Sequence, residues 1–253
     1  MWSPEGREGT PLKRDFASLN KPLPYILQKM IKAIIFDLGG VLMTDVPLKE
    51  IAEDLSKRLT LPAEEIWAHL YPSEHWELLT LGKITEEEYW DDFLKTSKIS
   101  EKLEVRSEKL KKELKKKVRS SLFPLGHSTR IINLLRNRYK LAILSNHAKE
   151  WSEYMKQEFD LFKSFDPIIF SCDVGFRKPD PQIYEMALER LKCEPEECIF
   201  IDDKKRNTDA GEKLGIKGIV FEDASKLIED LSKLGVKIES KKQRAHRAEY
   251  KPL

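Results

Sequence analysis

Residues 34–42 read IIFDLGGVL: a short apolar run ends on Asp37, and Gly39 and Gly40 follow closely. A run of this kind predicts a buried parallel strand that stops at Asp37, with a tight turn beginning at the glycines. Asp37 would then stand at the carboxyl end of a strand, which is where open α/β sheets bind ligands. An aspartate that only caps the strand is the alternative, and the rest of the chain has to distinguish the two.

The composition describes a folded chain without a strong charge bias. Hydrophobic residues make up 40% of the 253 residues, which is enough for a sizeable core and argues against global disorder. Charged residues reach 35% but nearly cancel, at a net charge of +2, whereas a dedicated nucleic-acid binder usually carries a basic excess. No apolar run is long enough for a membrane span, so neither nucleic acid nor membrane is an expected partner.

The cysteines indicate the cellular compartment, and the two ends of the chain are interpreted as tails outside the fold. Cys172, Cys193 and Cys198 form no CxxC pair and are odd in number. We therefore expect buried thiols in a reducing compartment, and a cytoplasmic protein. Residues 1–29 lack the apolar core of a signal peptide and are interpreted as a flexible extension, and residues 237–253 as a basic tail.

The segment from residue 46 to residue 124 has a helical pattern throughout. Pro62, which two glutamates follow closely, indicates a helix start, and residues 85–88, TEEE, form a capping box. A later helix, over residues 103–122, places apolar side chains on one face. Its lysines would form the solvated face: Lys109, Lys111, Lys112, Lys115, Lys116 and Lys117.

The chain changes to an alternating α/β pattern after Pro124. Apolar runs predict strands at residues 141–144, 168–170, 198–201 and 218–221, separated by helices near 149–158, 181–192 and 207–214 and followed by one at 227–234. With the first strand, this predicts a doubly wound, Rossmann-like parallel sheet built from residues 30–45 and 125–236. One crossover needs far fewer residues than 46–124 contain, so this helical segment is expected to be an inserted cap over the carboxyl ends of the strands.

Polar residues follow four of the predicted strands, and a parallel sheet brings such strand ends to one edge. They are Asp37, the pair Ser145 and Asn146, the run Arg177-Lys178-Pro179, and the pair Asp202 and Asp203. Each is common in turns, but together they form a chemical set. A carboxylate such as Asp37 can attack phosphorus, and with a second aspartate it can hold Mg²⁺. The Ser145 hydroxyl can hold phosphate oxygens, and Lys178 can stabilise a transferring phosphoryl group.

The motifs FDLGGVL, LSN, RKPDPQIY and FIDDKKRN, in this order, closely resemble those of the haloacid dehalogenase-like superfamily of aspartyl hydrolases. The resemblance covers residues 31–235 and extends to the helical cap, where LGKITE at residues 81–86 is typical. The most similar branch contains sugar-phosphate phosphatases and the phosphatase domain of epoxide hydrolases. The resemblance implies a Mg²⁺-dependent phosphatase that hydrolyses a small phosphorylated metabolite through an aspartyl-phosphate intermediate.

The resemblance also implies a role for each motif residue. Asp37 would be the nucleophile, and Lys178 would bind both the nucleophile and the phosphate. Ser145 and Asn146 would bind phosphate as well. The metal would be held by Asp37, the Gly39 carbonyl and Asp203. Asp202 would act on the metal through water or support the residues that bind it, and Asn207 would support them as well.

Gly39 departs from the pattern of the family, which usually has Asp-x-Asp. The second aspartate protonates the leaving oxygen and then activates water, and a general acid–base group of this kind is worth about 10²- to 10⁴-fold in rate. Asp45, Thr44 and His147 are the nearby residues that could replace it.

Two other functions remain open from the sequence. One is a catalytically weak relative that binds a phosphorylated ligand or a protein partner, which the missing acid favours. The other is a hydrolytic dehalogenase, which attacks carbon without a metal and would leave the paired aspartates unused. The substrate and the oligomeric state are not specified by the sequence. Within the helical segment 46–124, several aromatic and histidine side chains could belong to the core of the cap or contact the substrate: Trp67, His75, Trp76, Tyr89 and Trp90.

Overall fold

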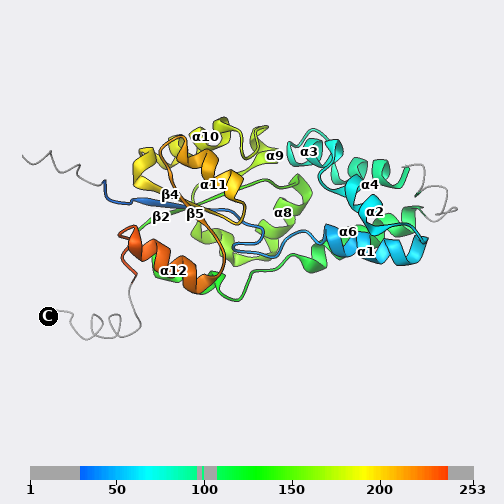
Figure 1. Ribbon diagram of the computed structural model, residues 1–253, viewed down its shortest axis with the longest axis horizontal. Helices are drawn as coiled ribbons and strands as arrows, with labels where there is room; N and C mark the ends of the chain where they lie inside the picture. The colour runs from blue at the N-terminus through cyan, green and yellow to red at the C-terminus, as the bar shows by residue number, and fades with distance from the viewer. Residues whose placement is uncertain (1–28, 96–98, 100–106, 239–253) are drawn as a thin grey trace, which may run out of the picture.

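A computed structural model describes residues 29–95, residue 99 and residues 107–238 of the chain (Figure 1). Most of the expected N-terminal extension and of the basic tail therefore lies outside the described residues. Five parallel strands form one sheet, in the order β3-β2-β1-β4-β5. They are β1 (Ala33–Phe36), β2 (Lys140–Ser145), β3 (Ile168–Phe170), β4 (Cys198–Asp202) and β5 (Lys217–Val220). The doubly wound parallel sheet expected from the sequence is confirmed.

Alternate residues of the strands pack against helices on opposite faces of the sheet. Ala33 and Ile35 contribute to one apolar cluster, and Ile34 and Phe36 contribute to the other. Since both faces are covered, the strands are apolar runs rather than alternating ones. The covering helices are α7 (Ser128–Leu135), α8 (Lys149–Glu158), α10 (Pro181–Leu191), α11 (Lys205–Glu212) and α12 (Ala224–Lys233), and the short α9 (Ser171–Val174) follows β3.

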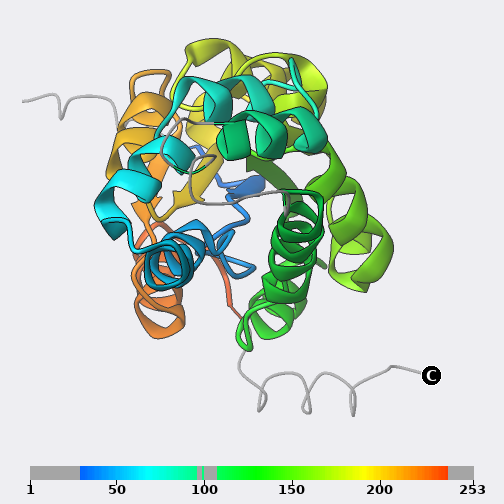
Figure 2. The ribbon, with the colours of Figure 1, turned by 90° about the vertical axis from the view of Figure 1, so that its right-hand side faces the viewer.

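The chain between β1 and β2 forms the helical insertion that the sequence predicts. In this article these helices are called the cap: α1 (Leu48–Leu59), α2 (Ala63–Leu70), α3 (Glu74–Thr80), α4 (Glu86–Lys95) and α6 (Ser107–Ser121). They gather at the end of the molecule toward which β1 runs, and an end-on view places them in front of the sheet (Figures 1 and 2). The cap therefore covers the sheet edge at which ligands bind in this fold.

Two connections join the cap to the sheet, and they lie side by side. Thr44 donates its backbone N–H to the Phe123 carbonyl at 3.0 Å and its hydroxyl to the Ser121 carbonyl at 2.5 Å. Met43 forms an isolated antiparallel bridge with Pro124. The chain thus enters and leaves the cap at one place, where backbone and side-chain hydrogen bonds hold both connections together.

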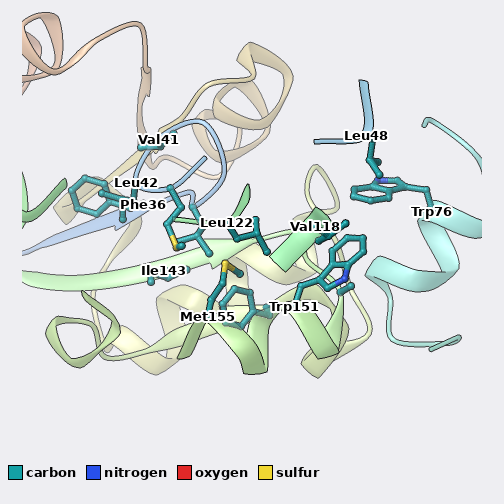
Figure 3. Packing of buried hydrophobic residues seen from close by; sticks show 14 of the residues in the cluster. Phe36, Val41, Leu42, Leu48, Trp76, Val118, Leu122, Ile143, Trp151 and Met155 are labelled. Carbon is teal, nitrogen blue, oxygen red and sulfur yellow. The ribbon is translucent and has the colours of Figure 1, made fainter. Parts of the chain in front are cut away.

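The apolar cluster of the sheet continues into the cap. Trp76 of α3 lies 5.9 Å from Trp151 of α8, measured between ring centroids, and Leu48 of α1 and Val118 of α6 belong to the same cluster (Figure 3). Each of these side chains is at most 9% exposed. None of the helices in the described part of the chain has the length and apolarity that crossing a membrane requires.

The local predictions within the cap are confirmed with one exception. Thr85 and Glu88 exchange the hydrogen bonds of a capping box, at 2.8 Å and 3.2 Å, and the apolar face of α6 is buried. The assignment of Lys111 to a solvated face is wrong, because this residue is 4% exposed. Its ammonium lies among the carboxylates of Glu87 and Asp91 on α4 and of Glu108 on α6.

Candidate active site

Asp37 lies immediately after β1 and is 5% exposed. Its backbone N–H donates to the Ile201 carbonyl at 2.8 Å, which continues the pairing of β1 with β4 beyond the end of β1. One carboxylate oxygen, Oδ1, accepts hydrogen bonds from the Leu38 N–H at 2.7 Å and from the Lys178 ammonium at 2.8 Å. The sheet and the following turn therefore hold this carboxylate at the floor of a pocket under the cap.

Lys178 lies between two buried carboxylates. Its Nζ is 2.8 Å from Asp37 Oδ1 and 2.6 Å from Asp202 Oδ2, and the residue is 2% exposed. The Asn146 side chain holds the backbone of Lys178 from both sides: its amide donates to the Lys178 carbonyl at 2.8 Å, and its oxygen accepts from the Lys178 N–H at 2.8 Å. The Asn146 side chain therefore positions the lysine, and Asn146 also lines the pocket in which the sequence analysis expects the phosphate.

Three carboxylates form a group that could hold a metal ion. Asp37, Asp202 and Asp203 each offer an oxygen, and these oxygens lie within 4.8 Å of one another. Burial raises the pKa of both Asp202 and Asp203, because a carboxylate without water is destabilised in its charged form. A bound cation would reverse this effect, and carboxylate oxygens are the ligands that Mg²⁺ prefers.

Asp202 and Asp203 are not equally free to bind a cation. Asp202 accepts hydrogen bonds on both oxygens, from Lys178, from the Asn207 amide at 2.9 and 3.0 Å, and from the Lys204 N–H at 2.8 Å. Asp203 Oδ1 is buried and finds no hydrogen-bond partner among the described residues. The group therefore fits a divalent cation held by Asp37 and Asp203, with Asp202 and Asn207 behind them.

Asp45 fills the space beside Gly39. A Cβ built on Gly39 would lie 2.6 Å from Asp45 Oδ1, and one built on Gly40 would lie 3.3 Å from Asp45 Oδ2. Only Gly40 of the two has a positive φ, +72°, so Gly39 is not required by backbone conformation. Although Asp45 is exposed, nearby protein atoms withhold water from its carboxylate and raise its pKa, against the opposing charge of Lys204.

The pocket has a volume of about 340 Å³ and a wall contributed by the cap. Trp67, Tyr71 and Trp76 line this wall, with ring centroids 5.4 Å apart between neighbours. Cationic side chains also line the pocket: Lys49, Arg177, Lys178, Lys204 and Arg206. The charges of Asp203, Asp37 and Asp45 raise the pKa of Lys204. They outweigh the partial loss of water around its ammonium, which alone would lower the pKa.

The structure separates the cap residues that the sequence left undecided. Trp67 and Trp76 line the pocket, whereas Tyr89 and Trp90 are at most 1% exposed inside the cap. His75 is partly exposed on the cap, and its Nδ1 lies 3.2 Å from a carboxylate oxygen of Asp92. Tyr71, which the sequence analysis did not single out, joins the wall because it follows α2 directly, and no motif marks it.

The remaining predicted residues come together as well. Gly39, Ser145, Asn146 and Asn207 all line the pocket with Asp37 and Lys178. Ser145 ends β2 beside Asp37 and is 2% exposed. The sequence analysis missed the cations Lys204 and Arg206, although both belong to the FIDDKKRN motif. Both cations closely follow Asp202 and Asp203 in the sequence, and cations near paired carboxylates are expected to balance their charge. This pattern could have identified them.

A family model described as haloacid dehalogenase-like hydrolase matches residues 31–215. A phosphorylated carbohydrates phosphatase from Thermotoga maritima is 29% identical over 196 residues, 75% of this chain and 84% of that protein. Flavin mononucleotide hydrolase 1 from Arabidopsis thaliana is 36% identical over 88 residues, and the match spans only 36% of its length. A HAD family enzyme from Bacteroides thetaiotaomicron, solved with magnesium and inorganic phosphate, shares the fold at a TM-score of 0.62 and 24% identity, over 78% of this chain and 98% of that one.

Proposed function

Since the chain belongs to the haloacid dehalogenase-like hydrolases, we propose that it is a Mg²⁺-dependent phosphatase of small phosphorylated metabolites, with Asp37 as nucleophile. The observation that carries the proposal is the ion pair of Lys178 with Asp37, at 2.8 Å, on the floor of a cationic pocket. A phosphate dianion approaching a carboxylate meets repulsion, and an ammonium beside the attacking oxygen offsets it. The phosphatase and hydrolase names of the relatives support the same reaction class.

The proposed reaction has two displacements at phosphorus. Asp37 attacks the phosphate ester, the bond from phosphorus to the ester oxygen breaks, and the phosphoryl group is carried on Asp37. Water then displaces Asp37 from phosphorus and releases inorganic phosphate. Lys178 contacts the nucleophile in the free enzyme and would contact the phosphoryl oxygens during transfer, and the Ser145 hydroxyl would bind another of these oxygens.

The metal assignment rests on the donor set of this chain. Asp203 Oδ1 is buried without a hydrogen-bond partner among the described residues, and its nearest cation, the Lys204 ammonium, is 3.9 Å away. A metal ion next to this oxygen would remove the cost of its burial. When bound, Mg²⁺ would supply positive charge that stabilises the phosphoryl group during transfer. The magnesium and phosphate bound to the Bacteroides enzyme support the choice of metal.

The pocket also supports a class of substrate. The aromatic wall of Trp67, Tyr71 and Trp76 faces the same space as the cations Lys49 and Arg206. Such a wall favours an apolar or planar body next to the phosphate, and the two outer cations favour a second polar or anionic group. We therefore propose a metabolite of this type rather than a simple alkyl phosphate as the physiological substrate.

The test is phosphate release from p-nitrophenyl phosphate with Mg²⁺ and with a chelator, for the wild type and for Asp37→Asn. Asp37→Asn keeps the side-chain shape but removes the attacking charge, so turnover should fall by more than about 10³-fold. Asp160→Asn changes an exposed aspartate outside the pocket lining; it is the matched control and should retain full turnover.

Three outcomes would contradict the proposal in different ways. Turnover of Asp37→Asn within about tenfold of the wild type would exclude Asp37 as nucleophile. Full activity in chelator, with halide released from a 2-haloacid, would identify a metal-independent dehalogenase. Binding of inorganic phosphate without hydrolysis of any ester would identify a protein that binds phosphorylated ligands without turning them over.

A further inference from the structure

The Asp45 carboxylate lies where a side chain at position 39 would begin. Its Oδ1 is 2.6 Å from the place of a Cβ on Gly39, the second residue after Asp37. Its Oδ2 lies close to Gly40, so the carboxylate spans the turn that follows the nucleophile. A side chain at position 39 and the carboxylate of Asp45 could not both occupy this space, and in this chain Asp45 occupies it.

Asp45 is attached to the connection that enters the cap, and this connection is fixed. The preceding residue, Thr44, is bonded through its N–H and its hydroxyl to the carbonyls of Phe123 and Ser121, on the connection that leaves the cap. Leu48, three residues after Asp45, begins α1 and is 3% exposed. Asp45 therefore reaches the pocket from a short segment that is held at both ends.

The atoms nearest the space beside Gly39 belong to Asp45 and to neither of the other two residues considered as replacements, although His147 lines the same pocket. The Thr44 hydroxyl donates to Ser121 and accepts from the Phe123 N–H, outside the pocket lining. His147 is 6% exposed, and its ring packs edge-on against Trp151 and Phe170. Asp45 is the residue of the three whose acidic group lies beside Gly39.

We propose that Asp45 is the general acid and base of the reaction, acting from the entrance of the cap in place of a side chain at position 39. In the first step Asp37 attacks phosphorus, the bond from phosphorus to the ester oxygen breaks, and the Asp45 carboxyl gives its proton to that oxygen, which leaves as an alcohol. In the second step the Asp45 carboxylate takes a proton from water as the water oxygen bonds to phosphorus. The bond from phosphorus to Asp37 then breaks, and inorganic phosphate leaves. This inference rests on the proposed phosphatase function.

The first experiment compares two leaving groups in Asp45→Asn. An alkyl phosphate needs a proton on its leaving oxygen, whereas p-nitrophenolate leaves without one. Asp45→Asn should therefore lower kcat/KM for the alkyl phosphate by about 10²- to 10⁴-fold, and for p-nitrophenyl phosphate by less than about tenfold. Glu53→Gln removes a negative charge from the exposed side of α1, outside the pocket lining, and should change neither value.

The second experiment tests the place of the carboxylate without altering it chemically. In Gly39→Ala the new methyl group would take the space of Asp45 Oδ1, and the flexible aspartate would swing away. This variant should fold normally and show the same selective loss on the alkyl phosphate. In the double variant Gly39→Ala/Asp45→Asn the losses should not multiply, because both changes remove one group from one place.

The outcomes separate this inference from the function on which it rests. If the wild type releases phosphate from no ester, the phosphatase function and the role of Asp45 both fail. If the wild type is active and Asp45→Asn loses equal activity on both esters, or none on either, Asp45 is not the proton donor. Multiplying losses in the double variant would show that Gly39 and Asp45 act separately, and would also overturn the inference.

Discussion

His147 places a titratable ring inside the wall of the active site. It is 6% exposed, and its Nδ1 is buried without a hydrogen-bond partner among the described residues. Burial lowers its pKa to about 4, and the Lys178 charge adds to this effect, while a backbone hydrogen bond with Ala148 opposes it. The ring is therefore neutral at pH 7, which suits a structural role better than proton donation.

We expect His147 to make the protein acid-sensitive. The unfolded chain takes up a proton near pH 6.5, whereas the folded chain resists protonation until about pH 4. The contribution of His147 to the free energy of unfolding is therefore complete above pH 6.5. It falls by about 3 kcal/mol in total as the pH is lowered from 6.5 to about 4. Urea unfolding at pH 7.5 and at pH 4.5 would measure it, and His147→Phe, which keeps an aromatic ring, should lose much less stability on acidification.

The exposed His69 offers a matched control for this pH dependence. Its ring lies on the cap surface, where its Nδ1 bonds to the Glu65 carbonyl at 2.8 Å. His69→Gln should retain the acid sensitivity of the wild type. An equal loss of stability in His147→Phe and in the wild type would show that other groups cause the acid sensitivity.

Residue identity predicted which side chains come together, but not what each side chain does. Asp37, Ser145 and Asp203 lie at or directly after strand ends, and parallel topology places them at one edge. Lys178 reaches the same edge on the loop that follows β3 and α9. The bonds of Asn146 to the backbone of Lys178 depend on the path of a loop, which has no periodic signal. The position of Asp45 beside Gly39 depends on how the chain enters the cap, and one sequence cannot show that route.

At the scale of elements, Glu86 joins three helices through one buried carboxylate. It lies on α4, is 1% exposed, and accepts both guanidinium nitrogens of Arg119 on α6, at 2.7 and 3.0 Å. It also accepts the indole N–H of Trp151 on α8 at 2.7 Å and that of Trp90 at 3.3 Å. One carboxylate therefore links two cap helices with a helix that covers the sheet.

We expect Glu86→Gln to destabilise the protein by about 2–3 kcal/mol, because the partly buried Arg119 loses its counter-charge and its paired hydrogen bonds. Urea unfolding at pH 7.5 is the measurement. Glu88→Gln, on the exposed side of the same helix, is the control, since glutamine can still close the capping box with Thr85 and should cost less than about 1 kcal/mol. Equal costs for the two variants would contradict a special role for Glu86.

The elements themselves were largely predictable, and the contacts between them were not. Apolar periodicity and the TEEE capping box located the helices of the cap, because these signals are local to each helix. The assignment of Lys111 to solvent also used only the pattern of its own helix, which is rich in lysine. Two of the acidic residues that surround Lys111 lie on α4. Periodicity within one helix carries no information about the charges on its neighbour.

At the scale of the whole molecule, the sheet and the position of the cap follow from the order of the motifs. Five alternating strands predicted the doubly wound sheet, and the excess length between the first two strands predicted an insertion at the ligand-binding edge. How firmly the cap rests on the sheet could not be predicted, because it depends on contacts between distant residues. These contacts include the Ser171 hydroxyl with the Thr80 carbonyl at 2.5 Å and the pair of Arg177 with Glu77 at 2.9 Å.

The shared apolar cluster makes the cap and the sheet dependent on each other. The cluster runs without interruption from Phe36 and Ile143 in the sheet, through Met155 and Trp151 on α8, to Trp76 in the cap (Figure 3). If the cap came away, these large apolar side chains would be exposed to water. The free energy of burying a large apolar side chain is about 1.5–3 kcal/mol, so several of them together oppose independent unfolding of the cap.

We therefore expect the cap and the sheet to unfold in one transition. Tryptophan fluorescence reports on the cap and on its contact with the sheet, because Trp67, Trp76, Trp90 and Trp151 lie there, while circular dichroism at 222 nm reports on all helices. Trp2 lies outside the described residues, and a Trp2→Phe background removes its signal. Thermal melts of this variant by the two methods should coincide within the error of the midpoints. A fluorescence transition well below the circular dichroism transition would show that the cap has a separate stability, and Asp45 would then lose its position before the sheet unfolds.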